Sequence, residues 1–261
     1  MKRTLIIPDR SSFPPALRPI FEGADVFDSS CASGAKVYFI NKDDGYYLKS
    51  AAAGTLAREA EMTRFFHQIG RGAEVLHYES SESDWLLTRR VPGEDCTHAQ
   101  YTAEPRRLAI AQGEILRALH ETSAASCPVA DRTAEYLAEA MANYHAGRWD
   151  AALFPDNWGY RSAEEAWAVL QERAPHFRRD VLLHGDYCLP NVMLEDWRFA
   201  GFIDVGAGGM GDRHVDLFWG VWSLNFNLKT DQWGDTFLDA YGRDKVNPDM
   251  LRAVAAAEVF L

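Results

Sequence analysis

The chain has 261 residues, of which 47% are hydrophobic and 25% are charged. This composition is typical of globular proteins and excludes disordered and fibrous classes. Lys and Arg total 27 against 38 Asp and Glu, so the formal net charge is −11. The acidity argues against nucleic acid or an anionic membrane as a partner, because both repel a negative surface. It is compatible with a cationic small molecule, although acidity that serves solubility alone is the commoner case.

The cysteines and the apolar pattern predict where the protein works. The cysteines are far apart and predict neither a zinc site nor a disulfide framework; they are Cys31, Cys96, Cys127 and Cys188. The first apolar run ends at Pro8, too early for a signal peptide, and no apolar stretch approaches the ~20 residues of a membrane span. We therefore expect a reduced, cytoplasmic protein with no membrane partner.

In the first third of the chain, the pattern predicts strands around one helix. Residues 35–41 and 46–49 are β-rich and are separated by the turn signal Lys-Asp-Asp-Gly, which predicts a hairpin. Residues 55–69 carry apolar side chains at i, i+3, i+4 and i+7, the helical period. Residues 74–78 and 85–90 are expected to form two more strands.

The rest of the chain is mostly helical in pattern. Pro92-Gly93 is the candidate hinge, and a β-rich island follows at 181–204. We expect helices at 103–122, 132–146, 162–173, 212–227, 232–241 and 248–261. The length suits one large domain or two lobes at roughly 100–200 residues per domain. We predict an α+β fold with a small antiparallel-sheet lobe, residues 1–91, and a larger helical lobe, residues 92–261.

The β-rich island carries the residues most suited to chemistry. An apolar strand runs into a loop that contains Asp186, Asn191 opens a second strand, and Asp204 ends a third. If the last two strands pair as a hairpin, Asn191 and Asp204 lie side by side, with Asp186 a few residues away. Mg²⁺ binds such oxygens through one or two protein carboxylates together with substrate phosphates, so the set indicates phosphoryl transfer. Taken singly, Asp186 and Asp204 are better explained as turn residues that cap strands, and only their combined spacing favours the metal site.

A second, independent pair lies in the N-terminal third. Glu59 is at the edge of the apolar face of the helix at 55–69, where a carboxylate is costly unless it is paired. Lys49, at the end of the preceding strand, is the available cation nearest in sequence. Kinases hold the α- and β-phosphates of ATP with a lysine that a helix glutamate holds in turn. Taken separately, an exposed Lys49 and a solvated Glu59 would be the simpler interpretation.

The longer pattern resembles a known family. It reads His-Gly-Asp-Tyr-Cys-Leu-Pro-Asn at 184–191, Gly-Phe-Ile-Asp-Val-Gly at 201–206 and Asp-Arg-His-Val-Asp-Leu at 212–217. These segments resemble the aminoglycoside 3′-phosphotransferases and their streptomycin-modifying relatives, which are antibiotic phosphotransferases with a protein-kinase-like fold. Segments 35–38, 47–49, 85–87, 92–93 and 116–120 also fit, so the resemblance covers nearly the whole chain.

The resemblance implies roles for the residues that react or hold metal. Asp186 matches the catalytic aspartate, which accepts or orients the proton of the attacking hydroxyl. Asn191 and Asp204 match the Mg²⁺ ligands. Asp216 resembles a structural aspartate that braces the catalytic loop, and His184 is interpreted as a further brace rather than a base.

The resemblance also implies a nucleotide site for ATP or GTP. Lys49 matches the lysine that clamps the phosphates, and Glu59 matches its helix partner. Ser33 and Gly34 fit the short loop over the nucleotide phosphates. The segment 88–91 is expected to bind the purine through its backbone, so its side chains say little about the choice between ATP and GTP.

The substrate side departs from the family pattern. Ala207 stands where family members commonly carry Arg, and residues 217–230 contain no acid where the family usually places acids. That segment is aromatic instead, which indicates core packing for most of it and, for some rings, a pocket for a less densely cationic ligand. Asp156, Glu258 and the Leu261 carboxylate are the remaining candidates for contacts with amines.

We therefore predict an antibiotic-resistance kinase that moves the γ-phosphoryl group of ATP or GTP, with Mg²⁺, to a hydroxyl of an aminoglycoside. The expected partner is a cationic small molecule rather than nucleic acid, and the expected state is a monomer or weak dimer. One alternative is a kinase of the same fold for another small hydroxyl compound, such as streptomycin, another antibiotic or a metabolite. A second alternative is a nucleotide-binding pseudokinase, which the presence of every catalytic and metal residue disfavours.

Overall fold

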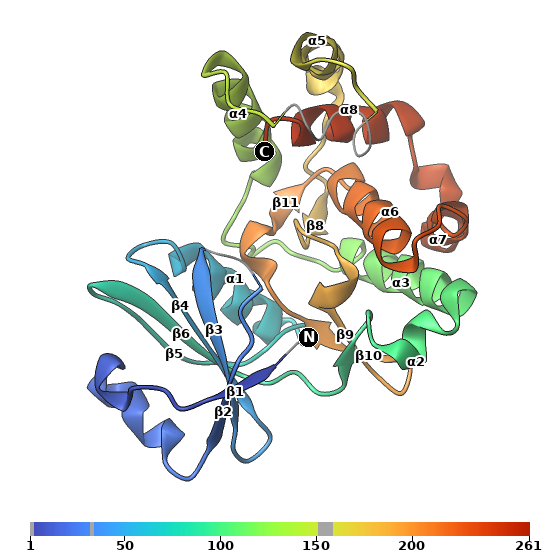
Figure 1. Cartoon of the computed structure of the whole chain (residues 1–261). Helices are drawn as coiled ribbons and strands as arrows, with labels where there is room; N and C mark the ends of the chain where they lie inside the picture. Colours follow the sequence, from blue (N-terminus) through green and yellow to red (C-terminus); the bar gives the residue numbers. More distant parts are fainter. Residues whose placement is uncertain (1–2, 32–33, 151–158) are drawn as a thin grey trace. The chain divides into compact units, whose positions relative to one another are not determined.

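The computed structural model describes residues 3–31, 34–150 and 159–261 (Figure 1). The chain divides into two compact units. The first contains the residues up to Asp95 together with Pro190–Gly206, and the second contains Cys96–Leu189 with Ala207–Leu261. The hairpin at 190–206 joins the first unit because its strand β9 (Val192–Glu195) pairs with β7 (Glu94–Asp95). The lobe boundary at residue 91 stays a prediction.

The first unit is built on an antiparallel sheet in the order β1-β2-β3-β4-β6-β5. Its strands are β1 (Thr4–Ile6), β2 (Asp25–Asp28), β3 (Ala35–Asn41), β4 (Tyr46–Ala52), β5 (Val75–Ser80) and β6 (Ser83–Arg89). The predicted hairpin is confirmed, with Val37 opposite Lys49 across β3 and β4. Lys49 therefore lies in the middle of β4, so its expected place at a strand end was wrong: the ladder continues to Ala52.

The main helix of this unit, α1 (Ala57–Gln68), confirms the helix expected at 55–69. It begins where the buried carboxylate of Asp84 accepts the backbone N–H groups of Gly54 and Leu56, at 2.9 and 2.7 Å. Those bonds satisfy amides that a helix start leaves without partners. Met62 and Phe66 are fully buried on the face the periodicity indicated.

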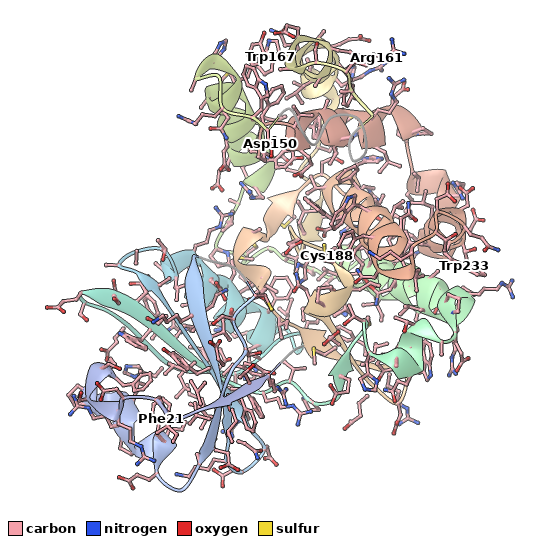
Figure 2. All side chains as sticks on the ribbon, viewed as in Figure 1. Phe21, Asp150, Arg161, Trp167, Cys188 and Trp233 are labelled. Atoms are coloured by element: carbon pink, nitrogen blue, oxygen red, sulfur yellow. The ribbon has the colours of Figure 1, made fainter. Side chains whose placement is uncertain are left out.

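A segment that the sequence pattern did not reveal completes this core. Residues Pro15–Phe21 form a 3₁₀ helix whose buried Leu17 and Phe21 pack, with Phe13, against sheet residues such as Ile40 and Leu48. Figure 2 labels Phe21 in this cluster. Three prolines and a mixed apolar pattern over 14–21 give no helical or strand period, so only the packing defines this element.

The second unit is mainly helical. Its helices are α2 (Ala99–Thr102), α3 (Pro105–His120), α4 (Arg132–His145), α5 (Ala163–Arg173), α6 (His214–Leu228), α7 (Gly234–Tyr241) and α8 (Pro248–Glu258). Figure 1 shows α3 beside α7 and α5 beside α8, which pack on each other. The helix expected at 103–122 is α3 and begins two residues later, because Pro105 takes its first position, where the missing N–H is tolerated.

Two short strands carry the loop of interest in this unit. β8 (Val181–Leu183) pairs antiparallel with β11 (Gly209–Gly211), and every β8 residue is buried. In the first unit, β9 pairs with β10 (Arg198–Phe202), which confirms the hairpin expected after Asn191. Among the residues that the structure describes, no helix is long and apolar enough to cross a membrane.

Candidate active site

The loop after β8 is held in one conformation by its glycine. Gly185 has φ +86°, and an added Cβ would collide with the backbone carbonyl of Ala207. Only glycine combines this backbone conformation with so close an approach. The turn therefore delivers Asp186 directly after a buried strand.

Asp216 fixes the same loop from α6. Its fully buried carboxylate accepts the N–H of His184 at 2.7 Å through Oδ2 and the N–H of Gly185 at 2.8 Å through Oδ1. His120 Nε2 lies 3.1 Å from Oδ2, and its Nδ1 lies 2.8 Å from the Tyr241 hydroxyl. These contacts confirm Asp216 as a brace of the loop. His184 is also a brace, since its Nδ1 accepts the N–H of Asp186 at 3.3 Å.

A cavity of about 640 Å³ in the second unit contains Asp186. Its charged lining consists of Asp186, Glu139, Glu258 and Arg132. Arg132, near the start of α4, donates from Nε to the carbonyl of Ala207 at 3.1 Å. The positively charged side chain of Arg132 therefore lines this cavity, although Ala207 itself has no charge. Sequence reasoning missed Arg132, because no local signal links a helix start to a residue 75 positions later.

Glu258 is a buried acid of this cavity with two hydrogen-bond donors. Its Oε1 accepts the Tyr136 hydroxyl at 2.8 Å and the indole N–H of Trp219 at 3.1 Å. Burial raises the pKa of Glu258 to about 7, and the nearby Asp186 adds to this effect, while the two hydrogen bonds and Arg132 oppose it. Both bonds use one oxygen, so the second oxygen remains available to a ligand in the cavity.

The first unit contains a second cavity, of about 990 Å³. Its apolar walls include Val37, Leu86, Met193 and Ile203, and its charged lining includes Lys49, Glu59 and Asp204. A mostly apolar cavity with a few convergent charges is the usual form of a cofactor site. Apolar walls of this kind suit a flat base, and Lys49 is the cation among these three charges that can meet phosphate oxygens.

Lys49 is held between two carboxylates in this cavity. Its Nζ donates to Glu59 at 2.8 and 2.9 Å and to Asp204 Oδ1 at 3.1 Å. Burial alone would lower the pKa of Lys49, but the charges of Asp204 and Glu59 outweigh it and raise the pKa. Lys49 therefore keeps its positive charge at neutral pH. The pairing expected from the sequence between Lys49 and Glu59 is present.

Asn191 and Asp204 lie at the open end of the β9–β10 hairpin. Ile203 donates its N–H to the carbonyl of Asn191 at 3.1 Å, next to the register pair Phe202 and Val192. Asp204 has φ +55°, a left-handed conformation that is uncommon outside glycine. Its side chain is 51% exposed, whereas Asn191 is buried at 6%, so the carboxylate is the group that this end of the hairpin offers to solvent.

This donor set fits Mg²⁺. Among the described residues, no group of three or more His, Cys, Asp or Glu side chains is placed to hold a metal ion. Mg²⁺ does not need one, because it keeps several waters and takes further ligands from substrate phosphates. Asn191 and Asp204 would supply the protein ligands.

The remaining predicted residues are distributed as follows. Gly34 is exposed, and an added Cβ would meet nothing within 4 Å. Ser33 and Asp156 lie outside the described residues. Leu261 is 46% exposed and lines the Asp186 cavity. Asp186 belongs to the second unit, whereas Lys49, Glu59, Asn191 and Asp204 belong to the first.

A lysine–glutamate pair beside an exposed aspartate, on an antiparallel sheet with one main helix, defines a kinase-type phosphotransferase. The chain belongs to the phosphotransferase enzyme family, whose model matches residues 29–254. It is 45% identical, over 95% of both chains, to a probable aminoglycoside 3′-phosphotransferase of Lactococcus lactis subsp. lactis. This agrees with the family resemblance of the sequence motifs.

Solved structures agree with the fold. The crystal structure of an aminoglycoside-3′-phosphotransferase of type VIII is 28% identical, covers 94% of this chain and 97% of its own, and has a TM-score of 0.79. The structure of APH(3″)-Id from Streptomyces rimosus with ADP and streptomycin is 23% identical, covers 97% and 99%, and has a TM-score of 0.67. The predicted protein-kinase-like α+β fold is confirmed.

Proposed function

We propose that this enzyme transfers the γ-phosphoryl group of ATP or GTP to a hydroxyl of an aminoglycoside and thereby confers resistance. The observation that carries the proposal is Asp186, placed by Gly185 and Asp216 in a cavity that also contains Glu258. The relative at 45% identity is described as a probable aminoglycoside 3′-phosphotransferase, and a structural relative holds ADP and streptomycin.

On the donor side, Lys49 holds the phosphates and Glu59 keeps the lysine in place. The lysine stays charged, because the charges of Asp204 and Glu59 outweigh its burial. When bound, Mg²⁺ neutralises phosphate charge, and Asn191 and Asp204 would hold it. Gly34 stays a predicted part of the loop over the phosphates, together with Ser33.

On the acceptor side, Asp186 accepts or orients the proton of the attacking hydroxyl. The hydroxyl oxygen forms a bond to the γ-phosphorus, the bond to the β-phosphate oxygen breaks, and ADP or GDP leaves. Positioning the hydroxyl in line with the γ-phosphorus contributes to the rate together with electrostatic stabilisation of the transferred group. Glu258 is the strongest candidate for an amine contact, since an acceptor ammonium would favour its charged form. Asp156 and Leu261 stay predicted contacts.

A second candidate is a kinase of the same fold for another small hydroxyl compound. Two observations favour it: Ala207 offers no side-chain charge, and residues 217–230 contain no acid. The pseudokinase alternative is disfavoured, because Lys49, Glu59 and the catalytic and metal-binding candidates are all present; these candidates are Asp186, Asn191 and Asp204. The proposed partner is a small molecule. The proposed site of action is the cytoplasm, where nucleoside triphosphates are available. The proposed oligomeric state is a monomer or weak dimer.

One assay tests the proposal. Purified enzyme is incubated with aminoglycosides, streptomycin and hygromycin B, each with ATP and with GTP, and ADP or GDP release is measured. Asp186→Asn and Asp186→Ala should lower kcat by about 10²–10⁴-fold and leave nucleotide affinity unchanged. The matched control is Asp196→Asn, at the exposed β9–β10 turn, which should keep full activity. Retained turnover in both Asp186 variants would remove Asp186 from its role, and activity on none of the aminoglycosides would refute the proposed acceptor class.

A further inference from the structure

A row of buried hydrogen bonds continues from the loop of Asp186, past Asp216, to the end of α7. Nε2 of His120 lies 3.1 Å from Oδ2 of Asp216. On the other side of the imidazole ring, Nδ1 lies 2.8 Å from the hydroxyl of Tyr241, the last residue of α7. Tyr241 and His120 are both buried. We name Asp216, His120 and Tyr241 the brace network.

Close packing of two helices holds Tyr241 against His120. The helices α3 and α7 lie beside each other (Figure 1), and α3 has a glycine where they meet. A Cβ at Gly113 would collide with the backbone carbonyl of Phe237 and would lie 2.9 Å from the backbone nitrogen of Tyr241. Gly113 and His120 are about two helical turns apart, so they share one face of α3. The rings of His120 and Tyr241 meet edge to face there, with centroids 5.5 Å apart.

Arg213 sets the direction of the hydrogen bonds in the brace network. Its Nη1 donates to the hydroxyl oxygen of Tyr241 at 3.3 Å, and its Nη2 donates to Asp180 at 3.3 Å. A guanidinium group can only donate, so the single hydrogen of the Tyr241 hydroxyl is left for Nδ1 of His120. Burial raises the pKa of Tyr241 to about 12, so the hydroxyl keeps that hydrogen at neutral pH. These directions select the tautomer of His120 that carries its hydrogen on Nε2.

This tautomer is the one that Asp216 needs. Oδ2 of Asp216 accepts the N–H of His184 as well as facing Nε2 of His120. If His120 carried its hydrogen on Nδ1 instead, a nitrogen lone pair would face the carboxylate and repel it. The carboxylate would then move, and with it the N–H groups of His184 and Gly185 that it accepts. Both residues directly precede Asp186 in the chain.

We propose that Tyr241 is a positioning residue for phosphoryl transfer: its hydroxyl fixes the tautomer of His120 and thereby, through Asp216, the position of Asp186. The inference rests on the proposed function for the role of Asp186. A tyrosine that served folding alone would contribute to stability but not to turnover. The two roles therefore differ in what a loss of the hydroxyl changes.

The test removes one hydroxyl group. Tyr241→Phe keeps the ring and its packing. The matched control is Tyr160→Phe, because Tyr160 is also buried and donates its hydroxyl to the backbone carbonyl of Arg252 at 2.6 Å, outside the brace network. For both variants and the wild type, kcat and KM are measured with the best acceptor and nucleotide of the panel above. Amide hydrogen exchange is followed by NMR, and urea unfolding gives the stability.

The expected result is selective. Tyr241→Phe should lower kcat by roughly 10-fold, because a displacement of about 1 Å in a reacting group costs up to 10²-fold. Both KM values should stay within about 2-fold, since no group that binds substrate has changed. Amide exchange of His184 and Gly185 should become about 5- to 10-fold faster, the worth of one hydrogen bond. Tyr160→Phe should lose a similar amount of stability and keep kcat, KM and the slow exchange of both amides.

A second comparison tests the route through His120. Glutamine at this position places an NH₂ group near the former Nε2, so it keeps a donor for Asp216 and loses the contact with Tyr241. When Tyr241→Phe is added to His120→Gln, kcat should therefore change by less than about 2-fold. A full 10-fold loss in this background would show that Tyr241 acts by another route and would overturn the inference.

Other results separate the inference from the proposed function. Unchanged kcat in Tyr241→Phe, or equal losses of kcat in Tyr241→Phe and Tyr160→Phe, would overturn the inference while turnover by the wild type upholds the proposed function. If the wild type phosphorylates no aminoglycoside, the proposed function fails, and amide exchange alone decides the inference. Faster exchange of His184 and Gly185 in Tyr241→Phe but not in Tyr160→Phe then supports it, whereas equal exchange in the two variants overturns it.

Discussion

Replacing Glu258 by glutamine isolates the free energy of a buried charge. In the fold, Tyr136 and Trp219 both donate to the same oxygen of Glu258. Glutamine keeps a carbonyl oxygen for both donors and places its NH₂ group where the second carboxylate oxygen was. The substitution therefore preserves the packing and removes only the titration.

The magnitude follows from the pKa. A rise in the pKa of Glu258 from 4.5 to about 7 corresponds to about 3 kcal/mol. Because the folded pKa is the higher one, the folded state binds more protons between these pH values. The stabilising contribution of this Glu258 proton is complete below pH 4.5 and is lost as the pH rises to 7. Above pH 7 the charged Glu258 is a constant cost, which glutamine does not have.

The assay is urea unfolding of the wild type and of Glu258→Gln between pH 5 and pH 8, monitored by circular dichroism. The variant's stability minus that of the wild type should increase by about 2–3 kcal/mol over this range and level off above pH 7. All other titrating groups are common to both proteins and cancel in the difference. A difference that is flat with pH, or that shrinks as the pH rises, would refute the reasoning.

Two further predictions concern the brace and the lysine. Asp216→Asn should destabilise the fold by about 3 kcal/mol, because one of the two buried N–H groups of the loop then faces an NH₂ group. Urea unfolding measures this loss of stability. A loss below about 1 kcal/mol would contradict the bracing role. Lys49→Ala should weaken binding of the ATP analogue AMP-PNP by roughly 10- to 100-fold, the worth of a hydrogen bond to a charged group. Glu59→Gln should weaken it less, because the lysine remains. Calorimetry compares the three proteins, and equal affinity in all of them would exclude Lys49 from phosphate binding.

Short-range sequence patterns predicted most of the helices and strands, and they predicted the phosphate-binding side of the site. A carboxylate on an apolar helix face needs a cation, and this argument led to the pairing of Lys49 with Glu59 that the structure contains. The predicted hairpin brings the backbone of Asn191 next to Ile203, the residue before Asp204, although a bulge between Phe199 and Gly201 shifts the register on the way. These conclusions needed only local geometry, which the sequence encodes directly.

The surroundings of the acceptor cavity were decided by tertiary packing. Glu258 meets Tyr136 from 122 positions away and Trp219 from 39 positions away, and Arg132 reaches Ala207 across 75 positions. No local sequence period predicts these contacts, because they depend on how several helices pack together. The sequence by itself therefore determined the phosphotransferase motifs and the acid-free segment at 217–230. Only the tertiary structure decided that Trp219 lines the Asp186 cavity while Phe226 stays 54% exposed, because the covering of each ring depends on which helices pack against α6.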